Sequence, residues 1–538
     1  MTKRILLTLL IFFLIPSCVP AAPTVDSTPQ AESTPEQWWD SAVFYEIFVR
    51  SFNDSDGDGV GDFNGITQKL DYLDELGISA VWLMPIFPSP SYHGYDVTDY
   101  YAVNPQYGTM DDFKNLVAEA HKRDIRIIID LVINHTSDKH PWFKDAKKNR
   151  NSPYRDWYIW SDTDPNYEGP WGERVWHSST SGFYYGIFEA FMPDLNYANP
   201  EVTAEMKKIA SFWLTNIGVD GFRLDAAKHL IEDGAKQENT EATHLWYQNE
   251  FYPAYKKMNP EALTVGELFG DGLSAIANYI KNDQFDLAFN FQLANSFIES
   301  ANSGKAGYLG TTLVTSDKSI ADHQYATFLT NHDQERIMSQ LGGDVNKAKL
   351  AAFLLLTSPG VPFIYYGEEI GMQGKKPDEN IRLPMQWTSG ENAGFSTGRP
   401  WRAPAGDYVY VNVDAQTATP DSLLEHYRAL IQLRNKYSTL QTGDLIPLKS
   451  NKPAVYSALR IDENGTFLVL INLSDKAIIE YNIALDGAGL AESATSVETV
   501  FGTDSAKAPE GSGEASQKYK PFESLNPYAM YVLRINLK

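Results

Sequence analysis

Two hydrophobic patterns alternate along most of the chain. Short, near-continuous apolar runs are typical of strands covered on both faces, whereas apolar residues three and four positions apart are typical of helices that bury one face. The expected strands are residues 43–49, 78–86, 125–133, 219–225, 263–267, 285–291, 326–331 and 361–366. The expected helices are residues 66–76, 111–123, 201–216, 347–356 and 421–436. Alternation on this scale predicts parallel β/α architecture.

Eight candidate strands match a TIM-type (β/α)8 barrel, so we expect an α/β fold with such a barrel. The alternative is an open, doubly wound sheet, which is disfavoured because no glycine-rich phosphate-binding fingerprint follows the first strand. The alternation pauses at residues 139–197, which are irregular, rich in Trp, Tyr, Pro and Asp, and too long for a simple loop. This stretch predicts an inserted subdomain after strand 3.

The last hundred residues show a different pattern from the barrel. Short alternating stretches at residues 454–459, 466–472 and 528–535 predict an antiparallel β domain at the C-terminus. The expected organisation is therefore a barrel made of residues 38–138 and 198–440, an inserted subdomain at residues 139–197, and a C-terminal β-sandwich domain at residues 441–538.

The first residues carry a targeting pattern. Two basic residues precede an apolar run at residues 5–15, which is too short for a membrane span and is typical of a signal peptide, here residues 1–17. The tetrapeptide Ile-Pro-Ser-Cys that ends at Cys18 resembles a bacterial lipobox, in which the cysteine is acylated; the alternative is a secretory signal cleaved a few residues later. Residues 18–37 are rich in Pro, Ser, Thr and Ala and predict a flexible tether. We therefore expect an extracytoplasmic, lipid-anchored protein, or otherwise a secreted one.

Charge and composition narrow the expected partners. The chain has 69 acidic and 45 basic residues, a formal net charge of −24. Nucleic acid and anionic lipid head groups would repel it, so neither is expected as a partner, and a membrane is expected only through an anchor on Cys18. That residue is the only cysteine, which excludes an intrachain disulfide. Aromatic residues make up 13% of the chain, and their amphipathic rings suit ligands with apolar faces and hydroxyl edges, such as sugars.

Polar residues gather where the expected strands end, which is where such a barrel builds its active site. Charged residues in buried strands are unfavourable unless they are paired or functional. The residues at these ends are Asp130, Asn134, His135, Arg223, Asp225, Lys228, His229, Glu267, Asn331, His332 and Asp333. Cleavage of a glycosidic bond needs one carboxylate to attack the anomeric carbon and one carboxylic acid to protonate the leaving oxygen. The sequence contains no nucleophile-elbow serine triad, HExxH or CxxC motif.

Four segments at these strand ends, DLVINHT, GFRLDAAKH, GELF and FLTNHD, resemble the signature regions of the α-amylase superfamily, and MPDLN at residues 192–196 resembles a further one. The resemblance covers the chain from about residue 38 to the C-terminus. It implies a retaining glycoside hydrolase with Asp225 as nucleophile, Glu267 as general acid/base, and Asp333 hydrogen-bonded to the distorted sugar. In retaining enzymes the first two carboxyl groups lie about 5–5.5 Å apart.

The same resemblance implies further contacts with an α-glucan substrate. Arg223 would orient the nucleophile, and Lys228 and His229 would reach toward the leaving group. The residues implied for the cleavage subsite are Tyr95, as a stacking platform, with Asp96, His135 and His332.

Acidic residues recur at alternate positions from residue 54 to residue 62, a spacing of hard oxygen ligands that suits calcium. The stretch is not an EF-hand, because Gly65 stands where that loop needs a glutamate. It resembles the metal loop of the oligo-1,6-glucosidase branch, which implies Ca²⁺ ligands at Asp54, Asp56, Asp58, Asp62 and the Val60 carbonyl; the alternative is a solvated acidic turn. The resemblance to typical α-amylases implies a second Ca²⁺ site at Asn134, Asp194 and the backbone carbonyl of His229.

Markers of two branches of the superfamily occur together. Residues 51–66 and 384–401 resemble the oligo-1,6-glucosidase side, whereas MPDLN and AAKH resemble the amylase and neopullulanase side. Ala226 follows the nucleophile where 1,6-specific members tend to carry Val, so we expect cleavage of α-1,4 bonds in starch and maltooligosaccharides. The alternative is a transglycosylating relative, such as a 4-α-glucanotransferase, trehalose synthase or α-glucosidase. A non-catalytic sugar-binding lipoprotein is disfavoured because all three acids are present.

Overall fold

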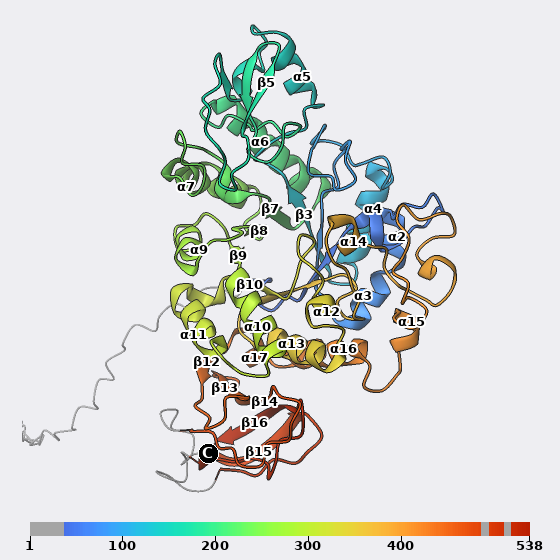
Figure 1. Cartoon of the computed structure of the whole chain (residues 1–538), viewed down its shortest axis with the longest axis vertical. Coiled ribbons are helices and arrows are strands. Elements are labelled where there is room, and N and C mark those ends of the chain that lie inside the picture. The colour runs from blue at the N-terminus through green and yellow to red at the C-terminus, as the bar shows by residue number, and fades with distance from the viewer. Residues whose placement is uncertain (1–36, 486–493, 510–517, 538) are drawn as a thin grey trace, which may run out of the picture. The chain divides into compact units, whose positions relative to one another are not determined.

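Eight parallel strands close into a barrel (Figure 1) in the computed structural model, which describes residues 37–485, 494–509 and 518–537. Around the ring the order is β1, β2, β3, β7, β8, β9, β10, β11, and β11 pairs with β1. The strands are β1 (Phe44–Ile47), β2 (Ala80–Leu83), β3 (Arg126–Leu131), β7 (Gly221–Leu224), β8 (Leu263–Gly266), β9 (Leu287–Phe289), β10 (Tyr325–Phe328) and β11 (Val361–Tyr365). The predicted TIM-type (β/α)8 barrel is therefore confirmed.

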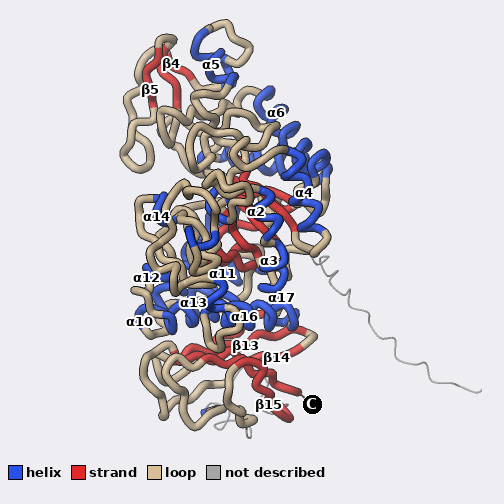
Figure 2. The backbone as a smooth tube through the Cα atoms, turned by 90° about the vertical axis from the view of Figure 1, so that its right-hand side faces the viewer, coloured by secondary structure: helices blue, strands red, loops and turns tan. Residues whose placement is uncertain are grey.

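Helices connect successive strands and surround the barrel, as Figure 2 shows in blue. The longer ones are α2 (Phe63–Gln68), α3 (Leu70–Leu76), α4 (Met110–His121), α6 (Pro200–Ser211), α7 (Glu241–Trp246), α8 (Tyr252–Met258), α9 (Leu273–Ile280), α10 (Phe291–Ser303), α11 (Leu309–Ser319), α13 (Val345–Thr357) and α16 (Leu423–Lys436). The shorter ones are α1 (Val49–Phe52), α12 (Ile337–Gln340), α14 (Asp378–Ile381), α15 (Val413–Gln416) and α17 (Ser438–Thr442). Among the described residues, no helix combines the length and the apolar character that crossing a membrane requires.

Two expected elements end differently from the apolar pattern. The strand expected at residues 285–291 stops at Phe289, because the Asn290 side chain accepts a hydrogen bond from the Leu293 N–H at 3.0 Å and caps α10. The helix expected at residues 201–216 is α6 followed by a π-helical turn, η2 (Phe212–Ile217). Apolar spacing marks which residues are buried, and the hydrogen bonds of the cap and of the π turn decide where each element ends.

Aromatic rings fill the inside of the barrel. The ring of Phe289 lies 5.0 Å from that of Phe363 and 5.5 Å from that of Trp82, and all three side chains are buried. Fully burying one such ring contributes about 1.5–3 kcal/mol. Trp82 also extends toward the carboxyl ends of the strands, where its ring lies 5.5 Å from that of His332 and 5.2 Å from the Arg223 guanidinium carbon. The packed interior therefore supports the polar residues at the strand ends.

The chain between β3 and β7 forms the insertion. It contains α5 (Pro141–Lys148) and an antiparallel sheet in the order β4 (Trp160–Ser161), β6 (Gly182–Tyr185), β5 (Trp176–Ser179). Its returning segment runs beside the end of β3: the Leu195 N–H donates to the Asn134 carbonyl at 2.9 Å, and the Thr136 N–H donates to the Pro193 carbonyl at 3.1 Å. Side chains of the barrel and of the insertion therefore meet at this place.

The C-terminal residues form a five-stranded antiparallel sheet, which confirms the predicted antiparallel β domain. Its order is β12 (Asp444–Pro447), β13 (Val455–Asp462), β14 (Gly465–Asn472), β16 (Met530–Leu537), β15 (Ala494–Phe501). Arg460 of β13 is buried and donates to the backbone carbonyls of Thr357, Leu440 and Gly443 at 2.8–2.9 Å. Carbonyls at helix C-termini carry partial negative charge, so this arginine ties the sheet to the end of α13.

Candidate active site

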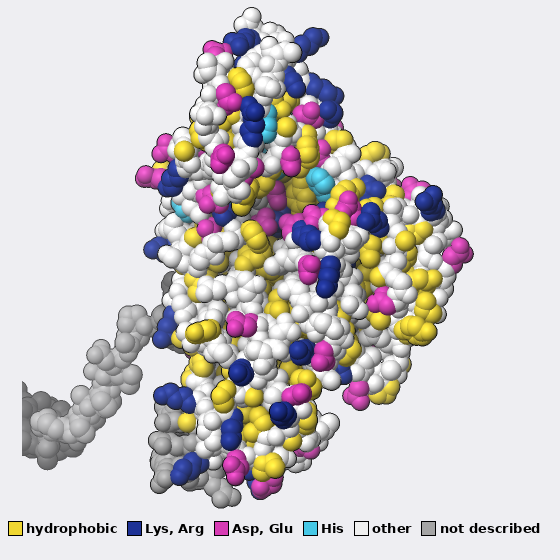
Figure 3. Space-filling model, in the orientation of Figure 1, with side chains coloured by type: hydrophobic (Ala, Val, Ile, Leu, Met, Phe, Trp, Pro, Cys, Tyr) yellow, Lys and Arg dark blue, Asp and Glu magenta, His cyan; other side chains and the backbone are white. Residues whose placement is uncertain are grey.

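A cavity of about 780 Å³ opens at the carboxyl ends of the barrel strands. Figure 3 shows acidic and apolar side chains gathered around a hollow in the molecule. Of the residues predicted from the sequence, those that line the cavity are Tyr95, His135, Asp225, Lys228, His229, Glu267, Asn331 and Asp333. The structure therefore brings the three predicted catalytic acids to one place.

Arg223 links the acids behind the cavity wall. Its side chain is 1% exposed; Nη1 donates to Asp225 at 2.7 Å and to Asp130 at 2.9 Å, and Nη2 donates to Glu267 at 2.5 Å. The barrel register places Asp130 of β3 beside Arg223 of β7, and β8 follows on the other side. One guanidinium fork thus holds the predicted nucleophile and the predicted acid/base on the same wall.

Ala226, directly after the predicted nucleophile, has a φ of 50°. This left-handed conformation costs a residue with a side chain about 1–2 kcal/mol. It turns the chain from β7 into the short 3₁₀ helix η3 (Ala227–His229) and directs the Ala226 backbone N–H to the Glu267 carboxyl. The two catalytic positions are therefore connected through the backbone as well as through Arg223.

Burial and nearby charge set the protonation of the acids. Burial raises the pKa of Glu267 to about 7, although Arg223 acts in the opposite direction. Burial also raises the pKa of Asp225, and Arg223 limits the rise. Desolvation would do the same to Asp333, but His332 and then Arg382, which lie beside it, lower its pKa to about 2. The cavity thus holds one carboxyl that keeps a proton near neutral pH and one that stays ionised.

Tyr95 lies on the cavity wall, and His332 lies behind it. The two rings stack at 5.6 Å, and the Tyr95 hydroxyl lies 2.6 Å from His332 Nε2 and donates to Asp130 at 3.1 Å. His332 is fully buried and does not line the cavity; its Nδ1 lies 2.5 Å from Glu46 Oε1. His332 therefore supports the Tyr95 platform, and its contact with the sugar stays a prediction.

Asp96 also stands away from the cavity. Its side chain is buried, and it accepts hydrogen bonds from the hydroxyls of Ser89 at 2.6 Å and Ser137 at 3.4 Å. It is absent from the cavity lining and braces the loops around the site, and its place in the cleavage subsite stays a prediction.

Arg382 is a site residue that the sequence did not reveal. It lines the cavity, donates from Nη2 to Asp333 Oδ1 at 2.7 Å, and donates from Nε to the His332 carbonyl at 2.9 Å. It follows α14 in a loop after the last strand. The nearby residues 384–401 indicated only a branch of the family. An arginine in a loop has no periodic pattern, so the sequence could not place Arg382 beside an acid 49 residues away.

Aromatic and cationic residues form the wall beside the acid/base. Trp171 of the insertion is 54% exposed, and its ring lies 5.4 Å from that of His229. Phe269, two residues after Glu267, is also 54% exposed, and its carbonyl accepts a hydrogen bond from Lys228 Nζ at 2.7 Å. Large rings exposed in a cavity are suited to stacking against sugars, so this wall can hold the group that leaves.

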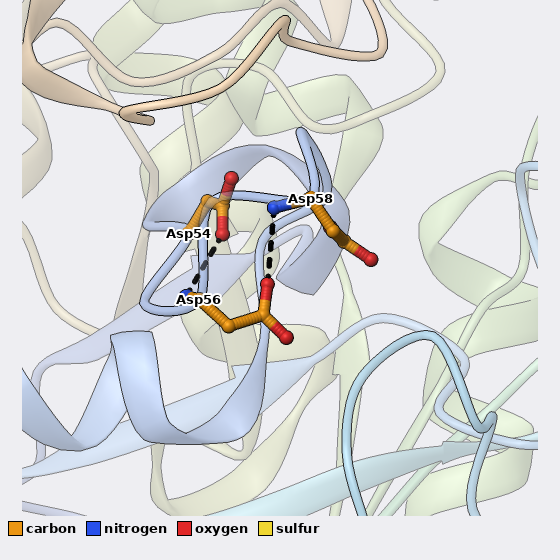
Figure 4. A group of neighbouring side chains, drawn as sticks. All are labelled: Asp54, Asp56 and Asp58. Carbon is orange, nitrogen blue, oxygen red and sulfur yellow. Dashed lines mark hydrogen bonds between the residues drawn. The ribbon is translucent and has the colours of Figure 1, made fainter.

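The acidic loop brings three of its predicted metal ligands together. Oxygens of three carboxylates lie within 4.8 Å of one another, a spacing that fits a hard cation: Asp54, Asp56 and Asp58. Figure 4 shows how the loop is shaped: the Asp56 N–H donates to Asp54 and the Asp58 N–H to Asp56, at 3.1 Å each. The Val60 N–H donates to Asp58 in the same way, at 2.8 Å.

Asp62, a further predicted ligand of this loop, caps a helix. Its carboxylate accepts hydrogen bonds from the backbone N–H groups of Ser55 and Gly65, at 2.7 Å each, and so caps α2. A Cβ atom at Gly65 would lie 1.9 Å from the Asn53 carbonyl oxygen, which explains why glycine stands there. Asp62 therefore closes the loop, and its role as a metal ligand stays a prediction.

The second predicted metal set is brought together in part. Asn134 Nδ2 donates to Asp194 Oδ2 at 3.2 Å, and both side chains are buried. Among the described residues Asn134 Oδ1 has no hydrogen-bond partner, and an unpartnered buried oxygen beside a carboxylate fits a cation. The His229 imidazole faces the Gln237 carbonyl at 3.1 Å. Glu232, which the sequence did not single out, is hydrogen-bonded to Asp194, and burial raises the pKa of Asp194 to about 7.

Comparisons with known proteins agree with this architecture. Residues 46–443 match the family model "Alpha amylase, catalytic domain". Alpha-amylase 3 of Dictyoglomus thermophilum is 43% identical over 443 residues, which cover 82% of this chain and 86% of that protein. Oligo-1,6-glucosidase of Parageobacillus thermoglucosidasius is 35% identical over 511 residues, covering 82% and 91%. The crystal structure of an alpha-amylase from H. orenii superposes with a TM-score of 0.81 at 41% identity, covering 92% of this chain and 99% of that one.

Proposed function

The chain belongs to the α-amylase family of glycoside hydrolases, and we propose that it hydrolyses α-1,4-glucosidic bonds in starch and maltooligosaccharides with retention of configuration. One observation carries the proposal: the Arg223 guanidinium binds both Asp225 and Glu267 on the wall of a cavity that Asp333 also lines. The contact of both carboxyl groups with one guanidinium supports the short separation of about 5–5.5 Å that retaining enzymes need.

The reaction follows from the protonation of these groups. The Asp225 carboxylate attacks the anomeric carbon while the bond to the leaving oxygen breaks, and that oxygen takes the proton of Glu267. Glu267, now ionised, removes a proton from water, and the water oxygen attacks the same carbon and releases Asp225. Asp333 keeps its charge, so it can accept hydrogen bonds from the sugar hydroxyls throughout.

The substrate is proposed from the shape and chemistry of the wall. Ala226, with its small side chain, lines the cavity next to the nucleophile and leaves room beside the cleaved bond. Trp171 and Phe269 offer apolar faces on the side of the general acid, where the leaving part of a glucan chain would lie. These features favour, as the substrate, a chain of several glucosyl units over a single small glycoside.

The first prediction concerns products. Incubation with soluble starch or maltotriose should give only shorter maltooligosaccharides and glucose, because water takes the glycosyl group, and isomaltose should remain intact. Chromatography over time measures this, with Asp225→Asn as an inactive control. Oligomers longer than maltotriose would identify a transferase, and trehalose an isomerase; either would overturn the hydrolytic assignment while keeping the same catalytic residues.

The second prediction concerns pH. Because Glu267 has a pKa of about 7 and must donate a proton, kcat/KM on maltooligosaccharides should fall as the pH rises through about 7. An α-maltosyl fluoride needs no proton on its leaving group, so its kcat/KM should lack this alkaline limb. Glu267→Gln should lose about a hundredfold or more on maltooligosaccharides and much less on the fluoride. Equal losses on the two substrates would exclude Glu267 as the acid.

We propose that the loop at residues 54–62 holds a calcium ion through Asp54, Asp56 and Asp58. Asp54 already accepts hydrogen bonds from the N–H groups of Gly57 and Gly59, at 2.8 Å each, so it anchors the loop. The other two carboxylates are more exposed and can complete the coordination of a hard cation. The chemistry such an ion supplies there is structural, because the loop is shaped by acids that repel one another when it is empty.

The third prediction is a calorimetric one. Asp56→Asn combined with Asp58→Asn should bind one Ca²⁺ fewer than the wild type in isothermal titration and lose part of the Ca²⁺-dependent rise in Tm. Glu75→Gln removes an exposed acid of α3 and should behave as the wild type. If the double variant bound as many Ca²⁺ ions as the wild type, the loop would be a solvated acidic turn and not a calcium site.

We also propose that the protein is extracytoplasmic and carries a lipid on Cys18, on the strength of the short apolar run and the lipobox-like tetrapeptide before it. These residues lie outside the part of the chain that the structure describes. Cys18→Ser should shift the protein, expressed in a bacterium, from the detergent phase to the aqueous phase of a Triton X-114 partition. A wild-type protein found wholly in the aqueous phase would exclude the anchor.

A further inference from the structure

Glu232 lies on the segment that follows β7 and η3, seven residues after Asp225. Its Oε1 is buried and, among the described residues, has no hydrogen-bond partner. Its carboxyl is hydrogen-bonded to that of Asp194, which is 1% exposed. Two acids in contact away from water are unfavourable unless a proton or a cation lies between them.

A second unpartnered oxygen belongs to the same cluster. Asn134 is fully buried and donates through Nδ2 to Asp194, while its Oδ1 has no partner within the described chain. Tyr185 lies next to the acids, and its hydroxyl is directed to the Gln237 side chain. Buried polar atoms are nearly always satisfied, so two unpartnered oxygens in one place, on Asn134 and Glu232, point to an absent ligand.

Three separate segments supply these oxygens. Asn134 follows β3, Asp194 lies in the returning segment of the insertion, and Glu232 belongs to the segment after the predicted nucleophile. Carboxylate and amide oxygens in a flexible arrangement suit a hard divalent cation of the size of calcium. Transition metals prefer imidazole or thiolate ligands, and neither type of ligand is part of this group of oxygens.

We propose that Glu232 is a direct protein ligand of the cation held by Asn134 and Asp194, so that one ion ties the barrel, the insertion and the segment after Asp225 together. The inference rests on the resemblance to typical α-amylases, which implies a cation near Asn134 and Asp194, and it adds the residue that extends the site to a third segment. It also gives the site a second carboxylate ligand, which the set expected from the sequence lacked.

The consequence concerns the wall of the cavity beside the acid/base. Lys228 and His229 stand four and three residues before Glu232, respectively, and line the cavity. A ligand from their own segment fixes that segment against the insertion, which carries Trp171 at a ring distance of 5.4 Å from His229. Occupancy of the cation site therefore orders the surface on which the leaving sugar rests.

The experiment is Ca²⁺ titration of the chelator-treated full-length protein, followed by calorimetry and by Tm with and without Ca²⁺. Glu232→Gln keeps the shape and can donate an N–H to Asp194, so the metal-free Tm should stay equal or rise. The affinity of one site should fall about tenfold or more, and the Ca²⁺-dependent rise in Tm should shrink. Glu241→Gln, which removes an exposed acid at the start of α7, should leave both quantities unchanged.

The possible results test two claims separately: that Glu232 is a ligand, and that the cation site exists. If Asp194→Asn abolishes one Ca²⁺ site while Glu232→Gln binds as the wild type, Glu232 is no ligand and the inference is overturned, whereas the proposed function stands. If the wild type has no Ca²⁺ site sensitive to Asp194, the cation site itself is overturned, whatever the activity on starch. A Glu232→Gln variant that loses stability equally with and without Ca²⁺ would show a purely structural carboxyl pair and also contradict the inference.

Discussion

The buried contact between Arg223 and three carboxyl groups is the interaction on which the site depends. Arg223 is 1% exposed, and alone it would be strongly destabilised, as would each acid. Contact between opposite charges offsets the unfavourable burial of Arg223 and of the acids, but there are three acids and only one base. Burial raises the pKa of both Asp130 and Glu267 to about 7, so the group holds a proton near neutrality. Of these two, only Glu267 opens on the cavity and can pass that proton to a ligand.

The strand pairing of the closed barrel brings Arg223 and the three acids together. Asp130 stands beside Arg223 because β3 pairs with β7, and Glu267 follows β8, the next neighbour. A shift of one residue in either pair would turn the side chains to the opposite face. The aromatic interior opposes such a shift, since Trp82 packs against both Phe289 and the Arg223 guanidinium. The stability of the core and the chemistry of the site thus rest on the same register.

Much of this could be predicted from the sequence, because both signals are local. The alternation of apolar runs gave eight strands, and acids that interrupt buried strands marked Asp225, Glu267 and Asp333. Contacts between remote loops have no such signal. Arg382 reaches Asp333, and Glu232 reaches Asp194, only after the barrel closes. The spacing of a motif also cannot say which acid caps a helix, so the cap that Asp62 forms on α2 is evident only in the structure.

The fate of the glycosyl group depends on how firmly the departing sugar is held. Water needs only access to the anomeric carbon, whereas transfer needs a second sugar bound beside Glu267. Trp171 and Phe269, each 54% exposed, give that side two apolar faces, but they stand on different segments. Lys228 joins the second of them to the segment after Asp225 through the Phe269 carbonyl. The longer the leaving sugar stays on these rings, the better it competes with water for the glycosyl group, so weak binding on this wall favours hydrolysis. The balance between hydrolysis and transfer therefore depends more on the contacts that position these two rings than on the three catalytic acids, which serve both reactions equally.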